Sequence, residues 1–209
     1  LNPSRPREAY LEAVRAIQRS IYEGDVYQVN LAHHLRGDWR GSPRTLFAAV
    51  LREARPAFGA YFELASGEVI CSASPELFLG YDATARRITT RPMKGTRPLG
   101  TDPAELRDAA KDRAELNMLV DLMRNDLGRV ARPGSVLVQR PRDIEPHEGG
   151  QLQATATITA ILAHARTLPD LLAASFPPGS ITGAPKLAAM DLIDRHEHEP
   201  RGWYCGSIG

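Results

Sequence analysis

Residues 151–161 read Gln151-Leu152-Gln153-Ala154-Thr155-Ala156-Thr157-Ile158-Thr159-Ala160-Ile161. Polar and apolar residues alternate along this stretch, and a period of two is typical of a β-strand with one polar and one apolar face. The apolar face, with Leu152 and Ile158, predicts a strand that packs on a hydrophobic core. The polar face, with Gln153 and Thr155, either lines a cleft or meets water, and the sequence leaves both alternatives open.

Helical and extended patterns surround this strand without the repeated strand–helix–strand units of a parallel sheet. Helices are predicted at residues 10–21, 46–51, 102–125 and 168–175, and from about residue 184 onward. Further strands are predicted at 27–31, across 58–90 and at 135–139, with a loop at 91–98 because proline and glycine are frequent there. The mixture predicts an α+β fold with mainly antiparallel sheet.

Composition limits the classes of function. The 209 residues suffice for one large domain, which we expect to span 1–209, and the net charge of +1 favours neither nucleic acid nor an anionic membrane as partner. No apolar stretch approaches the length of a membrane span. Two cysteines, Cys71 and Cys205, are too few for a disulfide framework, so a reducing cytoplasm is the expected location.

Two carboxylates lie on one side of the predicted helix 102–125. Glu115 stands on the apolar side, three and four residues before Met118 and Leu119, where a carboxylate needs a compensating cation. Asp112 lies one turn earlier, so the two together could hold a hard cation such as Mg²⁺. A salt bridge between Glu115 and Arg113, or a partly solvated position, is the alternative.

Two further residues could carry covalent or acid–base chemistry. Lys94 lies in the expected loop between Arg91 and Arg97, whose like charge would favour its neutral, nucleophilic form; a solvated lysine is the alternative. Glu76 follows Pro75 at a strand start, where it is either a general acid or an exposed edge residue.

A glycine-rich segment precedes the last predicted helix. Gly179-Ser180-Ile181-Thr182-Gly183-Ala184-Pro185-Lys186 could offer backbone N–H groups and hydroxyls to a carboxylate or phosphate, or could be an ordinary turn. Its glycine spacing excludes a Walker A loop. The histidines show no zinc-ligand spacing with the cysteines.

The order of the motifs along the chain resembles that of the chorismate-binding enzymes, which include anthranilate, aminodeoxychorismate, isochorismate and salicylate synthases. The motifs are Gly24-Asp25-Val26-Tyr27-Gln28-Val29-Asn30, Ser74-Pro75-Glu76-Leu77-Phe78, Pro92-Met93-Lys94-Gly95-Thr96, Lys111-Asp112-Arg113-Ala114-Glu115, Val120-Asp121-Leu122-Met123-Arg124-Asn125-Asp126-Leu127-Gly128 and residues 179–186. The resemblance runs from about residue 6 to Gly209. It implies an anthranilate synthase-like sandwich of mainly antiparallel sheets with outer helices.

Two positions separate the reactions within this family. Gln28 stands where the water-using isochorismate and salicylate synthases typically carry a lysine base, so the resemblance implies ammonia as the nucleophile. Lys94 stands where the aminodeoxychorismate-forming enzymes carry a lysine nucleophile and anthranilate synthases usually carry alanine. The implied reaction is a magnesium-dependent, transaminase-class conversion of chorismate and ammonia to 4-amino-4-deoxychorismate, for para-aminobenzoate and folate biosynthesis. The anthranilate synthase component I reaction is the alternative, and a catalytically incompetent chorismate-binding fragment is a further one.

The resemblance also implies roles for individual residues. Lys94 is the expected nucleophile, Glu76 the general acid, and Glu115 with Asp112 the magnesium ligands. The expected substrate-binding residues are Gln28, Gly95, Thr96, Gln153, Ser180, Thr182, Gly183 and Lys186. The sequence departs from the family pattern at Gln153, where many relatives have histidine, and at Ala156, where many have serine.

The resemblance finally implies parts outside this sequence. The family's substrate-binding arginine and the Glu-rich segment that completes its magnesium site would follow Gly209, and an N-terminal subdomain would precede Leu1, so we expect a chain truncated at both ends. Neither Cys71 nor Cys205 lies in a glutaminase nucleophile elbow. Ammonia is therefore expected from a glutamine amidotransferase, as a separate subunit or a fused domain.

Overall fold

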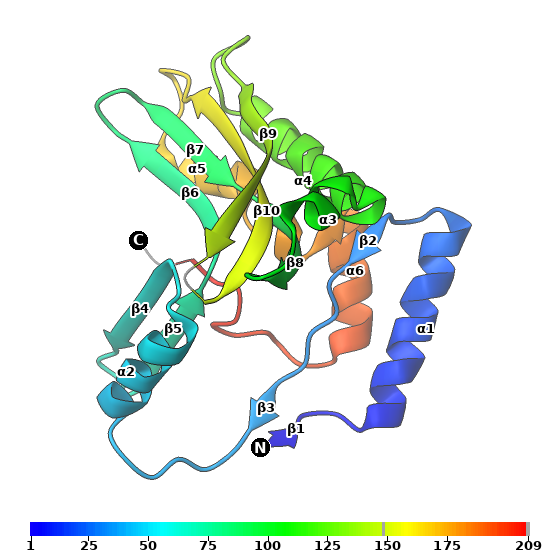
Figure 1. The fold of residues 1–209 in the computed structure, drawn as a ribbon, viewed down its shortest axis with the longest axis vertical. Helices are drawn as coiled ribbons and strands as arrows, with labels where there is room; N and C mark the ends of the chain where they lie inside the picture. The colour runs from blue at the N-terminus through cyan, green and yellow to red at the C-terminus, as the bar shows by residue number, and fades with distance from the viewer. Residues whose placement is uncertain (148, 208–209) are drawn as a thin grey trace. The chain divides into compact units, whose positions relative to one another are not determined.

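The computed structural model describes residues 1–147 and 149–207 (Figure 1). The chain divides into two compact units, one formed by residues 1–40 and 177–209 and the other by residues 41–176. Within the described part of the chain, no helix is both long enough and apolar enough to cross a membrane.

The larger unit is built on a five-stranded sheet whose strand pairs are all antiparallel. β10 (Gln151–Ile161) is the central strand, with β9 (Leu137–His147) along one edge. The other edge is shared by β8 (Met93–Pro98) and β7 (Arg87–Arg91), and β6 (Leu77–Asp82) pairs with β7 (Figure 1). The predicted α+β fold with mainly antiparallel sheet is confirmed.

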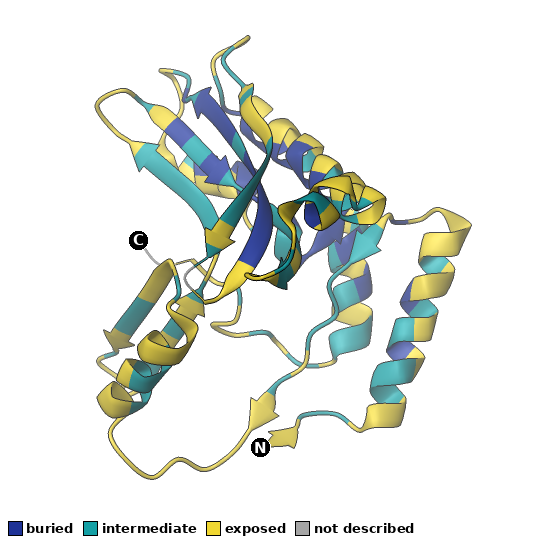
Figure 2. Ribbon diagram, viewed as in Figure 1, coloured by how far each residue is buried: buried dark blue, intermediate teal, exposed yellow. Residues whose placement is uncertain are grey.

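The apolar face of β10 forms the core of this unit together with two helices. These are α4 (Ala110–Gly128) and α5 (Leu168–Ser175), the second of which has the predicted bounds. The buried cluster contains Leu152, Ala154, Ala156, Ile158 and Ala160 of β10, Leu116, Val120, Met123 and Leu127 of α4, and Leu171 and Ala174 of α5. β10 is dark blue along most of its length in Figure 2. Burying each large aliphatic side chain stabilises the fold by about 1.5–3 kcal/mol, so this strand anchors the unit.

The polar face of β10 is also largely withdrawn from solvent. Gln153 is 8% exposed and Thr155 is 2% exposed, whereas Gln151 at the strand's start is exposed. The alternative in which this face simply meets water is therefore wrong for Gln153 and Thr155.

The long helix predicted from Asp102 is interrupted. Asp102 caps α3 (Pro103–Asp108) as expected, because its Oδ1 accepts a hydrogen bond from Ala104 N at 2.9 Å. The chain then leaves the helical conformation at Ala109, where ψ is 100°, and α4 begins at Ala110. Alanine is a strong helix former, so the sequence carries no signal for this break.

The loop predicted over residues 91–98 is instead mostly strand β8. Pro92 and Pro98 lie just before the strand and at its end, where a missing N–H disturbs the sheet least. The register of β8 on β10 shifts between Gln153 and Thr155, which marks a bulge formed by Lys94 and Gly95 of β8 opposite Ala154. Pairing with β10 therefore overrides the loop-like composition.

A hairpin and one helix complete the larger unit. β4 (Phe58–Glu63) pairs with β5 (Val69–Ser74), and α2 (Pro43–Ala54) packs against them through Phe47, whose ring centroid lies 5.5 Å from that of Tyr61. The predicted helix and the predicted short strands across residues 58–90 are confirmed, and the strands form two hairpins that belong to separate sheets.

The smaller unit joins the two ends of the chain. Its helices are α1 (Arg7–Glu23) and α6 (Lys186–Glu197), with a 3-10 turn η1 (Gly179–Ile181). Its short strand pairs are β1 (Asn2–Pro3) with β3 (Leu35–Arg36), and β2 (Gln28–Val29) with β11 (Gly183–Ala184). The predicted helices are confirmed, while the strand predicted at 27–31 is reduced to Gln28–Val29.

Candidate active site

Lys94 lies in the bulge of β8 and is half-buried. The next residue, Gly95, has φ +85°, and a Cβ added to it would lie 2.7 Å from Leu106 Cδ1 and 2.9 Å from Asp112 Cβ. A side chain at this position would be strained and would collide with α3 and α4. Gly95 thus allows the bulged strand to touch the helices directly, and this contact fixes the backbone next to Lys94.

Both cations near Lys94 in sequence are paired with carboxylates. Arg91 Nη2 donates to both oxygens of Glu145 at 2.7 Å and to Thr155 Oγ1 at 3.4 Å. Arg97 Nη2 donates to Asp112 Oδ2 at 3.0 Å. The predicted like-charge effect of these arginines on Lys94 therefore finds no support in the geometry.

Glu115 and Asp112 lie on consecutive turns of α4 but are engaged differently. Glu115 Oε1 is 3.8 Å from Lys111 Nζ, and its side chain is 35% exposed. This partner differs from the Arg113 alternative that the sequence left open. The Asp112 side chain is only 16% exposed and faces Arg97.

These two carboxylates can be tested against the needs of a magnesium ion. Mg²⁺ takes oxygen ligands, keeps several waters, and is usually held by one or two carboxylates together with the substrate. Glu115 fits this role because its exposed ion pair with Lys111 is weak. Asp112 does not fit in this arrangement because Arg97 holds its carboxylate. Residues 1–147 and 149–207 contain no group of three or more His, Cys, Asp or Glu side chains that could hold a metal.

Gln153 and Thr96, both expected to bind substrate, lie directly opposite each other in β10 and β8. Gln153 is also opposite Glu145 of β9, so three polar residues from adjacent strands share one face of the sheet. The Oε1 atom of Gln153 is buried and has no hydrogen-bond partner in the described structure. A buried acceptor without a partner costs free energy, so such an atom typically accepts a hydrogen bond from a bound ligand or an ordered water.

Glu76 lies between β5 and β6 and is half-buried, so it is not the exposed edge residue of the alternative. Ser74 Oγ donates to its backbone carbonyl at 3.3 Å. The next residue, Leu77, pairs with Arg91 at the end of β7, just before Pro92 and Lys94. The β6–β7 pairing thus places the predicted acid beside the end of β7, shortly before the predicted nucleophile in β8.

The other predicted site residues, which are Gln28, Ser180, Thr182, Gly183 and Lys186, lie in the smaller unit. β2 and β11 approach so closely that a Cβ on Gly183, whose φ is +146°, would lie 2.0 Å from Gln28 O. Thr182 Oγ1 donates to Pro178 O at 2.9 Å and is thereby used within the loop, and Lys186 is the first residue of α6. The pairing of β2 with β11 thus brings Gln28 and Gly183 together.

Arg201 was missed by the sequence analysis. Its guanidinium donates to Ile181 O at 2.7 Å, to Asn30 O at 2.7 Å, and to both oxygens of Glu197 at 2.6 and 2.8 Å. The hydrogen bonds with Glu197 raise the pKa of Arg201 above its ordinary value. One side chain therefore ties η1 and the residue after β2 to the end of α6. Glu145 was missed too, because its partner Arg91, like Asn30 for Arg201, lies far away in sequence.

Comparison with known proteins places this arrangement in a family. A family profile described as chorismate binding enzyme matches residues 1–209. Aminodeoxychorismate synthase component 1 of Klebsiella aerogenes is 45% identical over 210 residues, which cover 97% of this chain and 46% of that protein. Anthranilate synthase component 1 of Thermus thermophilus is 44% identical over 213 residues, covering 97% of this chain and 45% of that protein. The chain thus spans about half the length of the curated relatives it matches.

A solved structure agrees with the sequence comparisons. Anthranilate synthase component I of Streptococcus pneumoniae superposes with a TM-score of 0.89 at 28% identity, covering 100% of this chain and 46% of that one. The anthranilate synthase-like fold expected from the motifs is confirmed. Because the profile matches residues 1–209, this chain belongs to the family of chorismate binding enzymes.

Proposed function

We propose that this chain is the chorismate-binding part of an enzyme that converts chorismate and ammonia to 4-amino-4-deoxychorismate, a precursor of para-aminobenzoate and folate. The observation that carries this proposal is Lys94, held half-buried in the bulge of β8 beside Gly95. The name of the Klebsiella aerogenes relative supports it.

The residues suggest a two-step substitution. The Nζ of Lys94, as the free amine, attacks the ring carbon next to the one that bears the carboxylate, both conjugated double bonds of the ring shift, and the hydroxyl leaves as water with a proton donated by Glu76. Ammonia then attacks the carbon that bore the hydroxyl, both double bonds shift back, and the amine of Lys94 is expelled. One difficult substitution is thus divided into two easier ones, and the enolpyruvyl group is retained.

Binding is assigned to the surrounding polar groups. We assign Thr96, Gln153 and the backbone of Gly95 in the larger unit to the substrate. The binding roles that the resemblance implies for Gln28, Ser180, Thr182, Gly183 and Lys186 stay predictions. Magnesium, for which Glu115 offers one ligand, would neutralise the ring carboxylate of chorismate. Further ligands are expected from outside this chain.

Ammonia is proposed to come from a glutamine amidotransferase. The word component in the relatives' names supports a second subunit. Since neither cysteine of this chain lies in a glutaminase elbow, the amidotransferase is a separate or fused partner. A cytoplasmic location fits a protein whose two cysteines form no disulfide.

Anthranilate formation is the competing function, because the Thermus thermophilus relative is 44% identical. It would need neither Lys94 as a nucleophile nor retention of the enolpyruvyl group. A fragment that binds chorismate without turnover is the third candidate for the chain by itself.

Product analysis separates these candidates. Full-length enzyme is incubated with chorismate, Mg²⁺ and ammonium, and wild type is compared with Lys94→Ala and with Arg52→Ala, a control at a cation that is 74% exposed. We expect aminodeoxychorismate from wild type and the control, and a strong loss in Lys94→Ala. Anthranilate as the product, undiminished in Lys94→Ala, would overturn the proposal. The 209-residue chain is then tested separately for Mg²⁺-dependent chorismate binding, where saturable binding without turnover identifies a fragment.

A further inference from the structure

Asp112 joins the helix that carries Glu115 to the strand that carries Lys94. It lies in the first turn of α4, and its Oδ2 accepts a hydrogen bond from Arg97 Nη2 of β8 at 3.0 Å. The two side chains are 16% and 33% exposed, so the pair is screened less than a surface ion pair.

The same side chain also packs on the strand's backbone. A Cβ added to Gly95 would lie 2.9 Å from both Cβ and Cγ of Asp112. Asp112 thus contacts β8 at Gly95 by packing and at Arg97 by a charged hydrogen bond. These two contacts bracket Thr96 and follow Lys94 immediately.

A second arginine faces Asp112 from β9. The guanidinium of Arg142 donates to Leu106 O at 2.5 Å, while its Nε and Nη1 are buried without a partner in the described structure. Burial lowers the pKa of Arg142, and the nearby charge of Asp112 opposes that effect. Leu106 is the residue whose Cδ1 closes over Gly95, so Asp112 and Arg142 both support the contact at the bulge.

We propose that Asp112 is a positioning residue that locks the bulge of β8 onto α4, and so sets Lys94 relative to Glu115, instead of binding the metal. Glu115 lies three residues further along the same rigid helix. Movement of β8 would separate the nucleophile from the metal-bound carboxylate of the substrate, and a displacement of about 1 Å can cost about 100-fold in rate. The reading of Lys94 as nucleophile rests on the proposed function, whereas the locking itself does not.

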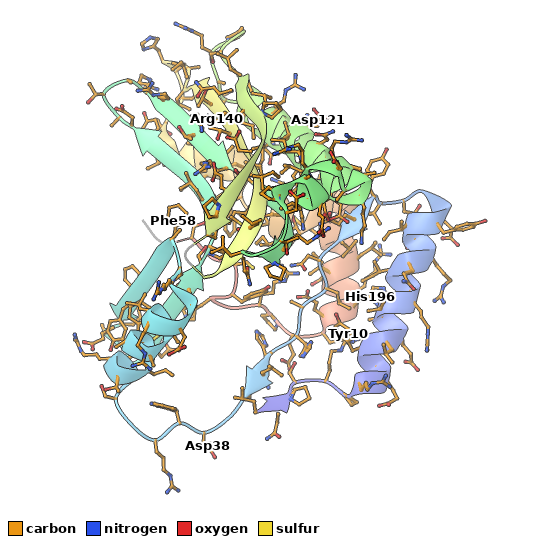
Figure 3. All side chains as sticks on the ribbon, in the orientation of Figure 1. Tyr10, Asp38, Phe58, Asp121, Arg140 and His196 are labelled. Carbon is orange, nitrogen blue, oxygen red and sulfur yellow. The ribbon has the colours of Figure 1, made fainter. Side chains whose placement is uncertain are left out.

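The test compares Asp112→Asn, Arg97→Gln and their double mutant in the full-length enzyme. Asp121→Asn is the matched control, because Asp121 pairs with Arg124 at 2.9 Å on the same helix but is 73% exposed (Figure 3). The measurements are kcat, KM for chorismate, the Mg²⁺ concentration at half-maximal rate, and the melting temperature. The rate at which trinitrobenzenesulfonate modifies Lys94 is followed by mass spectrometry.

A positioning role predicts that kcat falls by about 100-fold in Asp112→Asn while the half-saturating Mg²⁺ concentration stays at the wild-type value. Arg97→Gln should act in the same direction, and the double mutant should be no worse than the more impaired single mutant, because both break one contact. Asp121→Asn should leave all measurements unchanged. A metal ligand would behave differently: the half-saturating Mg²⁺ concentration would rise clearly above the wild-type value, the rate would recover at high Mg²⁺, and the proposal would be overturned.

Modification of Lys94 separates failure of this proposal from failure of the proposed function. We expect Asp112→Asn to change the modification rate relative to wild type and Asp121→Asn, whatever product the enzyme forms. An unchanged rate together with an unchanged kcat would overturn the locking role. If Asp112→Asn does not fold, Arg97→Gln, which removes the same hydrogen bond from the more exposed side, gives the same readouts.

Discussion

Gln153 in β10 lies directly opposite Thr96 in β8, and the Oε1 atom of Gln153 is buried without a hydrogen-bond partner. Replacing this residue should therefore affect binding more than folding. The acceptor forms no bond that the folded protein would lose, and removing an unsatisfied buried polar group is close to neutral for stability.

Gln153→Leu is accordingly expected to leave the melting temperature of the full-length enzyme near the wild-type value. KM for chorismate should rise by about 10-fold, the value of one lost hydrogen bond of about 1.5 kcal/mol. Steady-state kinetics and thermal unfolding check both parts, with Thr157→Val, on the same face of the strand, as the comparison. A clear loss of stability with unchanged KM would mean that Oε1 has a structural partner instead, such as an ordered water.

Gly183 supports the approach of β11 to β2, and a methyl group there should separate the strands. The added Cβ would lie 2.0 Å from Gln28 O at φ +146°, so both sterics and backbone strain oppose the substitution. Gly183→Ala should reduce the free energy of unfolding by about 1–3 kcal/mol from backbone strain alone, and the steric clash adds to this loss. Gly128→Ala, at the end of α4 with no atom within 4 Å of the new Cβ, should be neutral or slightly stabilising. Urea unfolding of both variants decides this, and equal stability would contradict the close approach.

The sequence predicted those parts of the fold in which local periodicity and packing agree. The alternation of β10 predicted its bounds and its apolar face, and the helix predicted at 168–175 is α5. β8 was missed because Pro92, Gly95 and Pro98 have the composition of a loop, while the strand forms through pairing with a segment more than fifty residues later. Extended structure there depends on tertiary contacts that no local window contains.

The motifs predicted which residues belong to the candidate site. They did not predict the hydrogen-bond and ion-pair partners of those residues. Lys94, Glu76 and Glu115 came from the resemblance. Asp112 came with them as a metal ligand, and its pairing with Arg97 could not be inferred, because it depends on how the segment with α3 folds α4 back onto β8. Pairing across long stretches of chain likewise hid the role of Glu145.

The capping box of α5 gives a prediction for acid stability. Asp170 accepts from Thr167 N at 2.7 Å and from Thr167 Oγ1 at 2.8 Å, and these bonds hold the pKa of Asp170 below its ordinary value. A lowered folded pKa means that the stabilisation is present above the unfolded value, near pH 3.9, and is lost as pH falls through the folded value. The melting temperature of wild type should therefore exceed that of Asp170→Asn at neutral pH, and the difference between the two should shrink below about pH 4. Thermal scans across that range test the sign; a difference that grows on acidification would refute it.

Arg201 makes four hydrogen bonds that a lysine cannot reproduce. Its planar fork reaches Ile181 O, Asn30 O and both oxygens of Glu197, whereas the single nitrogen of lysine carries only three donors that radiate from one point. Arg201→Lys keeps the charge but should leave some acceptors unpaired, including the Glu197 carboxylate, whose side chain is only 6% exposed. The expected loss is about 1–3 kcal/mol in the free energy of unfolding.

Amide hydrogen exchange should accelerate in Arg201→Lys at Asn30, whose N–H donates to Thr182 O, and at Ala32, whose N–H donates to Glu197. Arg36→Lys is the control, since Arg36 is 64% exposed and bonds Glu199 with one nitrogen. If the amide protons of Asn30 and Ala32 exchange at the same rate in Arg201→Lys as in Arg36→Lys, Arg201 does not hold the segment after β2 in place.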